Sequence, residues 1–441
     1  MAFYNSGVKS NVYDPILTLN NNRAEWQLPE GSLFLSSLRL HNVGASIGVA
    51  DTQFNKKGGV WAYIKNITLY DGSVVLDQLR EVGAFMAFKN YNKANRNNVG
   101  QEILKVGHAI GFLQNGTLGG QVAEAYQAPE IKTTTATTSR FALDLRRCLP
   151  FLKNSQFLPS MLYKNLRLVI EFNTDVLSTL HVGTNIASLA TLTDTLLVVD
   201  ELVNESVVAQ AMSQYQGVSF SAMEHDAFQM VPNAAIVAAG GSATATTSTI
   251  LHGFQGKFVN RLLMFASPVS SLASANAANA TLISSGKLRA VANADEVIQV
   301  RLNGMNMFGG TGINSTGEKL GMLHDTWGMC DHAPGTELIG VFSNLSTNAA
   351  GLASAAYTQD LTNSNSYFGC FIRDRVESLQ VDYTQTQFIP VGAGFNPVVP
   401  GNGIQELQDI VLGNQAQEVN VYAEVRKSVL REGMNYRVIY N

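Results

Sequence analysis

Charged side chains are scarce in this sequence of 441 residues. Asp, Glu, Lys and Arg make up 15% of it, below the roughly 25% of an ordinary soluble domain, although 46% of the residues are hydrophobic. Asn, Thr, Ser and Gln supply the polarity, and a surface of this kind is suited to contact with other protein chains. The net charge is −4 and no strongly basic tract is present. The sequence therefore lacks the electrostatic pattern of a nucleic-acid binder.

Cysteine and long apolar runs are also rare. The three cysteines, Cys148, Cys330 and Cys370, form no C-x-x-C pair and are too few for a disulfide framework, which predicts a reducing compartment. No apolar stretch reaches the roughly 18 residues of a membrane-spanning helix, and the first residues lack the pattern of a secretory signal. We therefore expect a chain that neither spans a membrane nor is exported by a standard signal.

Alternating strand patterns are the main feature that is present. Within residues 61–79 two alternating runs meet at Asp71-Gly72, a pair that accepts the positive φ angles of a two-residue hairpin turn. A second hairpin of the same kind is predicted within residues 296–307, where the chain turns at Asn303-Gly304. Two hairpins of one design, far apart in the sequence, indicate a domain built twice.

The first half contains roughly eight strand-like segments and one short helix, which is the inventory of a jelly-roll barrel. The strand predicted at 32–43 changes phase near its two serines, as a β-bulge would allow. The helix is predicted at 82–95, with one apolar stripe that we expect to lie against a sheet edge. The residues of this stripe are Val82, Phe85, Met86 and Phe88.

The length predicts two domains, because one hydrophobic core usually stops growing at roughly 250–300 residues. We divide the chain into an N-terminal arm at 1–30, a first jelly-roll at 31–205, a linker at 206–216 and a second jelly-roll at 217–441, with a long outer loop at about 308–366. The expected fold is all-β: a double jelly-roll of two eight-stranded β-sandwich barrels in tandem, with short helices and long loops.

The densest group of metal-binding residue types lies in the segment HDTWGMCDH. Its members are His324, Asp325, Cys330, Asp331 and His332. Their spacing matches no structural zinc pattern, and the second half of such a pattern is missing. We favour a loop that packs around Trp327, with metal binding as the alternative.

The segment GINSTGEK at 312–319 has the glycine spacing of a phosphate-binding loop. Glu318, however, stands where the essential lysine belongs, and Lys319 takes the place of the Ser/Thr. A carboxylate directed at a triphosphate would repel it, so a turn between strands is favoured. The sequence also contains no G-x-S-x-G elbow and no H-E-x-x-H helix.

Glu224, His225 and Asp226 are consecutive in a predicted strand, where successive side chains point to opposite faces and do not share a pocket easily. The pairs Arg146-Arg147 and Arg373/Arg375 are small basic spots, for which ion pairs at subunit contacts are favoured over phosphate binding. We therefore assign no catalytic, cofactor-binding or metal residue, and we expect no cofactor.

Five stretches, taken in order, resemble the major capsid proteins of polinton-like viruses, with those of adintoviruses and virophages as more distant relatives. They are LFLSSLRLHNVGA, the segment from WAYIKNITLYDG to NKANRNN, SRFALDLRRCLPFL, MLYKNLRLVIEFNTD and the closing EVNVYAEVRKSVL. The resemblance implies a double jelly-roll whose barrels stand upright side by side. It also implies that three chains form a pseudo-hexameric capsomer, which tiles an icosahedral shell around a double-stranded DNA genome.

The same resemblance implies the partners of the chain. These are further copies of itself, minor capsid and penton proteins, and an internal membrane that the N-terminal arm could reach, but no nucleic acid recognised by sequence. The expected function is thus that of a structural protein of the virion, assembled inside the host cell, with no enzymatic activity. The alternative is a glycan- or receptor-binding spike or fibre protein, for which Trp327 and Tyr357 would supply an exposed aromatic platform. A third hypothesis, an enzyme on a β scaffold, would need a cleft with convergent carboxylates.

Overall fold

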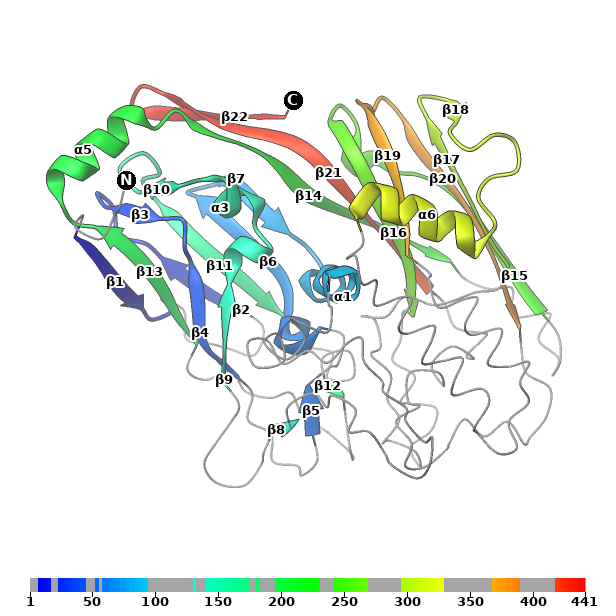
Figure 1. The fold of residues 1–441 in the computed structure, drawn as a ribbon, viewed down its shortest axis with the longest axis horizontal. Coiled ribbons are helices and arrows are strands. Elements are labelled where there is room, and N and C mark those ends of the chain that lie inside the picture. The colour runs from blue at the N-terminus through cyan, green and yellow to red at the C-terminus, as the bar shows by residue number, and fades with distance from the viewer. Residues whose placement is uncertain are drawn as a thin grey trace.

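The computed structural model describes residues 7–16, 23–44, 52–54, 58–93, 130–131, 140–173, 180–181, 195–230, 242–268, 295–328, 367–388 and 417–440. Two β-sandwiches lie side by side in these residues (Figure 1). We call them the first barrel, with strands β1 to β13, and the second barrel, with strands β14 to β22. Among the described residues, no helix is both long enough and apolar enough to cross a membrane.

The first barrel contains two main antiparallel sheets and a small third one. The six-stranded sheet contains β1 (Val8–Tyr13), β3 (Leu33–Leu35), β4 (Arg39–Gly44), β9 (Arg140–Asp144), β10 (Phe157–Pro159) and β13 (Leu196–Leu202). The four-stranded sheet contains, in spatial order, β2 (Arg23–Gln27), β11 (Leu166–Phe172), β6 (Ile64–Asp71) and β7 (Val74–Leu79). The small sheet contains β5 (Thr52–Phe54), β8 (Glu130–Ile131) and β12 (Leu180–His181).

The second barrel contains two antiparallel sheets. The five-stranded sheet contains β14 (Gly217–Met230), β21 (Gln417–Glu432), β16 (Phe258–Pro268), β19 (Phe368–Arg375) and β22 (Asn435–Tyr440). The four-stranded sheet contains, in spatial order, β15 (Ser242–Ile250), β20 (Leu379–Phe388), β17 (Asp295–Leu302) and β18 (Met305–Asn306).

The two barrels repeat one strand order. In the first barrel β13 lies between β1 and β4, and β4 also pairs with β9. In the second barrel β21 lies between β14 and β16, and β16 also pairs with β19. The order β2-β11-β6-β7 likewise corresponds to β15-β20-β17-β18. This is the arrangement of a jelly roll present twice, so the predicted double jelly-roll fold is confirmed.

Short helices join and cover the strands. They are α1 (Val82–Lys93), α3 (Pro150–Asn154), α5 (Glu205–Gln214), α6 (Thr316–Trp327) and the 3-10 helices η2 (Gly59–Tyr63), η3 (Leu145–Arg147) and η5 (His252–Phe254). Helices α1 and α6 each follow the equivalent hairpin of their own barrel, β6–β7 and β17–β18. Helix α5 lies in the predicted linker, and the side chain of Asn204 caps it by accepting the N–H groups of Ser206 and Val207.

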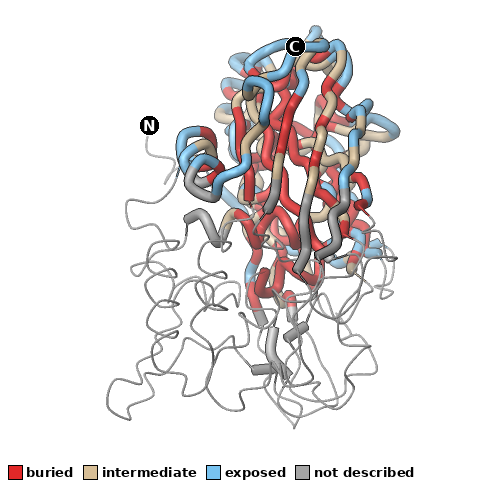
Figure 2. Tube along the Cα trace, turned by 90° about the vertical axis from the view of Figure 1, so that its right-hand side faces the viewer, coloured by how far each residue is buried: buried red, intermediate tan, exposed pale blue. Residues whose placement is uncertain are grey.

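The two longest strands connect the apolar cores of the barrels. Val218 and Phe220, near the start of β14, belong to the core of the first barrel, whereas Phe228 and Met230, at its end, belong to the core of the second. Strand β21 runs antiparallel to β14 over its whole length, and β22 adds to its far end. Figure 1 shows these strands extending from the second barrel across the top of the first, and Figure 2, which faces the second barrel, shows how buried and exposed residues are distributed along the described chain. The barrels therefore share strands and do not form independent units.

The prediction of an N-terminal arm at 1–30 is wrong for two segments, which are strands of the first barrel. Residues 8–13 form β1, which pairs with β13, and residues 23–27 form β2, which pairs with β11. Ala24 and Trp26 are fully buried, so β2 belongs to the core. β1 (VKSNVY) was missed because it does not alternate polar and apolar residues, whereas β2 (RAEWQ) does alternate and its signal was overlooked. The remaining residues of the predicted arm, 1–6 and 17–22, lie outside the described residues.

Three local predictions can be compared with the structure. The helix predicted at 82–95 is α1, and the four residues of its stripe are buried. The hairpin at Asn303-Gly304 is confirmed, because Leu302 pairs with Met305 and both turn residues have positive φ. The other hairpin turns one residue later than predicted, since Asp71 pairs with Val74.

Two strand predictions need correction. Residues 61–63 belong to η2, and Trp61, Ala62 and Tyr63 are all buried, which the alternating faces of a half-exposed strand do not allow. The strand predicted at 32–43 is interrupted at 36–38. Strands β3 and β4 both pair with β13, but the register changes between them, so the irregularity expected at the two serines is a break longer than a single bulge.

Candidate functional site

The most distinctive region of the described chain is the interface between the barrels, where α1 meets α6. Phe88 packs edge-on against Trp327 with ring centroids 5.5 Å apart, and Phe85 lies 6.4 Å from the same indole. Phe85 also packs against Tyr422 of β21 at 5.1 Å, and Phe88 against Tyr367 at 5.1 Å. The apolar stripe of α1 therefore contacts the second barrel, where the sequence predicted only a sheet edge.

Trp327 is fixed on three sides. Its Nε1–H donates a hydrogen bond of 2.9 Å to the carbonyl oxygen of Leu262. The guanidinium of Arg261 lies 4.0 Å from the ring centroid, in a cation–π geometry. Arg261 also donates to the carbonyl oxygen of Thr326 and forms an ion pair with Glu424. The indole thus joins the end of α6 to β16 and, through the rings of α1, to the first barrel.

Polar contacts also cross the interface. The hydroxyl of Tyr422 donates to the carbonyl oxygen of Glu81 at 2.9 Å, and Lys427 Nζ donates to the carbonyl oxygen of Val75 at 3.1 Å. The guanidinium of Arg431 donates to the carbonyl oxygens of Met212 and Tyr215 at the end of α5. Because each donor satisfies a backbone acceptor of the other barrel, these contacts fix the relative position of the two barrels.

A buried acid, Asp77, lies on β7 beneath this interface and is fully inaccessible to solvent. Its carboxylate accepts the backbone N–H of Phe151 at 2.8 Å and that of Gln78 at 2.9 Å. Burial raises the pKa of Asp77 to about 7, although these N–H groups and the charge of Lys427 oppose the shift. Burial in turn lowers the pKa of Lys427, which is 3% exposed. A charged residue inside the apolar strand VVLDQL is the signal that could have identified this acid.

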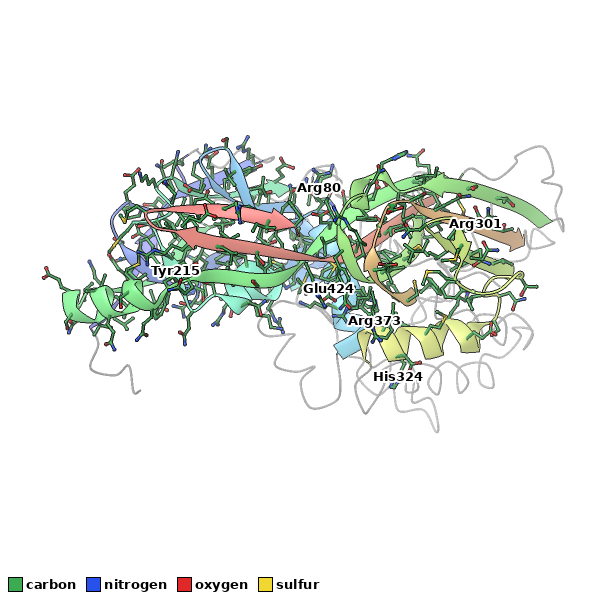
Figure 3. The ribbon with its side chains drawn as sticks, turned by 90° about the horizontal axis from the view of Figure 1, so that it is seen from above. Arg80, Tyr215, Arg301, His324, Arg373 and Glu424 are labelled. Carbon is green, nitrogen blue, oxygen red and sulfur yellow. The ribbon has the colours of Figure 1, made fainter. Side chains whose placement is uncertain are left out.

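The residues considered as alternative metal ligands are not brought together in the part of the chain that the structure describes. His324 and Asp325 are exposed neighbours on α6, 3.7 Å apart, and Figure 3 shows His324 pointing away from the strands. Cys330, Asp331 and His332 lie outside the described residues. No group of three or more His, Cys, Asp or Glu side chains in the described ranges is placed to hold a metal ion.

The predicted outer loop at 308–366 is wrong for residues 316–327, which form α6. The side chain of Ser315 accepts the N–H of Glu318 at 3.1 Å and so caps this helix. The sequence S-T-G-E is therefore a helix start and not a phosphate-binding turn, and the pattern of a capping box could have revealed it. Trp327 lies at the end of this helix, packed and half-buried, so it does not form an exposed platform. Residues 329–366, including Tyr357, lie outside the described residues.

The three consecutive polar residues of β14 have separate partners. Glu224 forms an ion pair with Lys257, and His225 Nε2 lies 2.9 Å from Asn420 Oδ1. Asp226 accepts the N–H of Ala227 through its side chain. Burial lowers the pKa of His225. Each of the three side chains thus has a local partner, and Glu224 and His225 line one pocket together with Lys257.

The predicted basic spots differ in their surroundings. Arg146 pairs with Asp144 at 2.5 Å, and Arg146 and Arg147 line a cleft between the barrels. Arg373 stacks on the ring of Phe371 at 3.8 Å and is exposed. Cys148 and Cys370 are buried thiols whose pKa is raised by burial to about 12. Neither thiol has the lowered pKa that a reactive cysteine needs.

Comparison with known proteins defines the fold. No family model matches this sequence. No curated protein matches it either. Solved structures do match: VP54 of PBCV-1, fitted into a reconstruction of the virophage Sputnik, has a TM-score of 0.58 at 10% identity and covers 99% of this chain and 97% of its own. The virophage Sputnik structure has a TM-score of 0.55 at 8% identity, covering 98% of this chain and 88% of its own. The mavirus major capsid protein has a TM-score of 0.52 at 7% identity, covering 98% and 90%.

The chain therefore has the double jelly-roll fold of viral major capsid proteins. Among the proteins that share it are capsid proteins associated with the virophages Sputnik and mavirus, in agreement with the resemblance found in the sequence.

Proposed function

We propose that this chain is the major capsid protein of a polinton-like or virophage-like virus. Three copies would form a pseudo-hexameric capsomer that tiles an icosahedral shell around a double-stranded DNA genome. The observation that carries the proposal is one strand order present twice in a single chain, with both barrels held side by side by shared strands. Three such chains place six similar sandwiches around one axis, so that threefold symmetry gives a nearly sixfold outline.

The remaining parts of the proposal follow from this role. The protein would act without catalysis or a cofactor, in the virion, after assembly inside the host cell. Its partners would be neighbouring capsomers, minor capsid and penton proteins, and an internal membrane. The low charge of the chain and its many uncharged polar residues support extensive contact between protein surfaces.

An unprotected sheet edge supports association of copies. β15 (SATATTSTI) pairs with β20 without a register shift, and β20 is its only partner strand among the described residues. Soluble monomers protect such edges with charges, proline or bulges, and β15 has none of these. It lies at the outer limit of the second barrel in Figure 1. We therefore propose that β15 is covered by a neighbouring chain in the capsomer or between capsomers.

The Thr246→Lys variant changes an exposed residue of β15 and is expected to weaken the association of chains without unfolding them. The charge would have to be desolvated when a second chain covers the edge, whereas a free edge leaves it in water. Light scattering over a concentration series measures the shift toward smaller species. The matched control is Gln255→Lys, which places the same charge on an exposed turn. If Thr246→Lys associates like the parent protein, β15 is not part of an interface.

The mass of the purified protein in solution tests the proposed function itself. Size-exclusion chromatography with light scattering is expected to give three times the 47.6 kDa of one chain, and negative-stain microscopy a hexagonal ring. A monomer that persists at high concentration would contradict the capsomer.

A further inference from the structure

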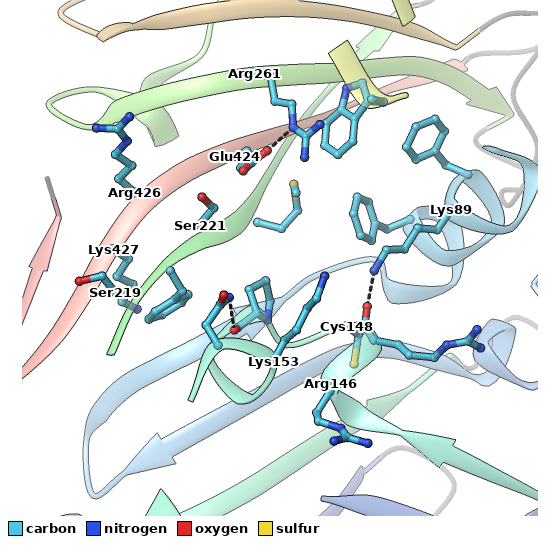
Figure 4. A pocket seen from close by; sticks show the side chains of 18 of the residues that line it. Lys89, Arg146, Cys148, Lys153, Ser219, Ser221, Arg261, Glu424, Arg426 and Lys427 are labelled. Atoms are coloured by element: carbon cyan, nitrogen blue, oxygen red, sulfur yellow. Dashed lines mark hydrogen bonds and ion pairs between the residues drawn. The ribbon is translucent and has the colours of Figure 1, made fainter. Parts of the chain in front are cut away.

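We propose that the cleft between the barrels binds an extended acidic peptide segment. The inference goes beyond the proposed capsid role and does not depend on it, because the cleft lies within one chain. It has a volume of about 510 Å³, within the size range of ligand sites, and is lined by α1, η3, α3, β14, β16, β21 and the end of α6 (Figure 4).

The positive charge of the cleft favours an anionic ligand. Seven lysine and arginine residues line it, against one carboxylate, that of Glu424. Glu424 is already paired with Arg261, and Arg146 is paired with Asp144. Lys153 and Arg426 have no carboxylate partner among the described residues, and Arg426 rests on the ring of Phe258 at 4.4 Å. In a chain of net charge −4, seven cations against one carboxylate make the lining of this cleft strongly positive.

The free backbone edge of β14 favours a peptide over other anionic ligands. Strand β14 pairs only with β21 in the described part of the chain, so its other edge has unpaired N–H and C=O groups. The cleft is lined by Ser219, Phe220 and Ser221, three consecutive residues. Because β14 is the edge strand of its sheet and these residues line the cleft, the unpaired backbone edge of β14 is within reach of a ligand in the cleft. An extended peptide can pair with such an edge, which a nucleic acid or a phosphate cannot do.

The floor of the cleft provides room for apolar side chains. Phe85, Phe88, Met223 and Trp327 line it together with the cations. A strand that alternates acidic and apolar residues would place its carboxylates toward Lys153 and Arg426 and its apolar side chains toward this floor. The ligand class is therefore an acidic, alternating segment in the extended conformation.

The test uses the full chain and a short fluorescent peptide that alternates glutamate and valine, with binding followed by anisotropy at low salt. The glutamine version of the peptide is expected not to bind. Two further peptides carry methyl groups on every second backbone amide, one on the odd-numbered amides and the other on the even-numbered amides. Only one of the two is expected to lose binding, because a strand pairs through the amides of one edge. These comparisons use the unaltered protein and so do not depend on any variant folding.

The double variant Lys153→Gln/Arg426→Gln is expected to weaken binding by about tenfold or more. The control Lys65→Gln/Lys164→Gln removes the same charge from exposed positions that do not line the cleft, and it should leave the affinity unchanged. The proposal would be overturned if the acidic peptide did not bind, or if both methylated peptides bound equally well. It would also be overturned if the control variant weakened binding as much as the double variant, or if oligothymidylate or inorganic triphosphate displaced the peptide at equal charge.

Discussion

The Trp327→Ala variant is expected to lower the free energy of unfolding by about 3–5 kcal/mol, the range for deleting a large aromatic side chain from a packed site. The substitution removes the ring contacts with Phe85 and Phe88, the stacking partner of Arg261 and the donor to the carbonyl oxygen of Leu262. Because the barrels share β14 and β21, the variant should still unfold in one transition, at a lower urea concentration than the parent. Urea unfolding followed by far-ultraviolet circular dichroism measures both effects.

Two further variants make this experiment specific. Trp327→Phe keeps an aromatic ring but lacks the N–H donor, so its cost should be near that of one hydrogen bond, about 1 kcal/mol. Met305→Ala truncates a side chain that is 73% exposed and should change stability by less than about 0.5 kcal/mol. An unfolding midpoint of Trp327→Ala equal to that of the parent would mean that the indole does not hold the barrels together.

The second large effect is a loss of stability as the pH rises from about 4 to about 7. Folding raises the pKa of Asp77 from 3.8 to about 7, so the folded chain binds this proton more tightly than the unfolded chain. The stabilisation is complete below the unfolded pKa and is lost as the pH rises through the folded pKa. A shift of about three pKa units corresponds to about 4 kcal/mol for this fully buried group.

The Asp77→Asn variant isolates this contribution, because it cannot ionise. Melting temperatures at pH 5 and pH 8 should differ less in this variant than in the parent, even though replacing one acceptor oxygen by an amide lowers stability at both pH values. His225 acts in the opposite direction, since its lowered pKa favours the folded state above the unfolded pKa of histidine. Its effect is common to both proteins and cancels in the comparison. Asp325→Asn, at a side chain 79% exposed, is the control, and an unchanged pH dependence in Asp77→Asn would refute the assignment.

Local patterns predicted the elements that local chemistry determines. The turn at Asn303-Gly304 and the apolar stripe of α1 are both encoded within a few residues, and both are present as predicted. The strand order was not encoded in this way. β1 and β2 gain their place in the sheets from β13 and β11, which are more than 130 residues away.

Only one of the two surfaces that form the interface between the barrels, that of α1, was predicted from the sequence. The stripe of α1 was visible in the sequence, but its partners Trp327 and Tyr422 lie far along the chain and are brought to it by folding. The contact of Lys427 with Val75 spans 352 residues, a separation over which no pattern in a single sequence gives a signal. Trp327 was placed in a loop because the capping pattern at Ser315 and Glu318 was interpreted as a turn between strands.

The shared strands have a consequence for the order of events during synthesis. The core of the first barrel includes Val218, Phe220 and Val429, and Tyr163 of this barrel packs against Tyr436 at 4.9 Å. A nascent chain that has not yet reached β21 therefore leaves Phe151 and Phe220 without the strand that covers them. The N-terminal barrel cannot close ahead of the C-terminal one on the ribosome. Only a chain that includes β21 can bury both cores, so products truncated before β21 would leave apolar side chains exposed and would aggregate.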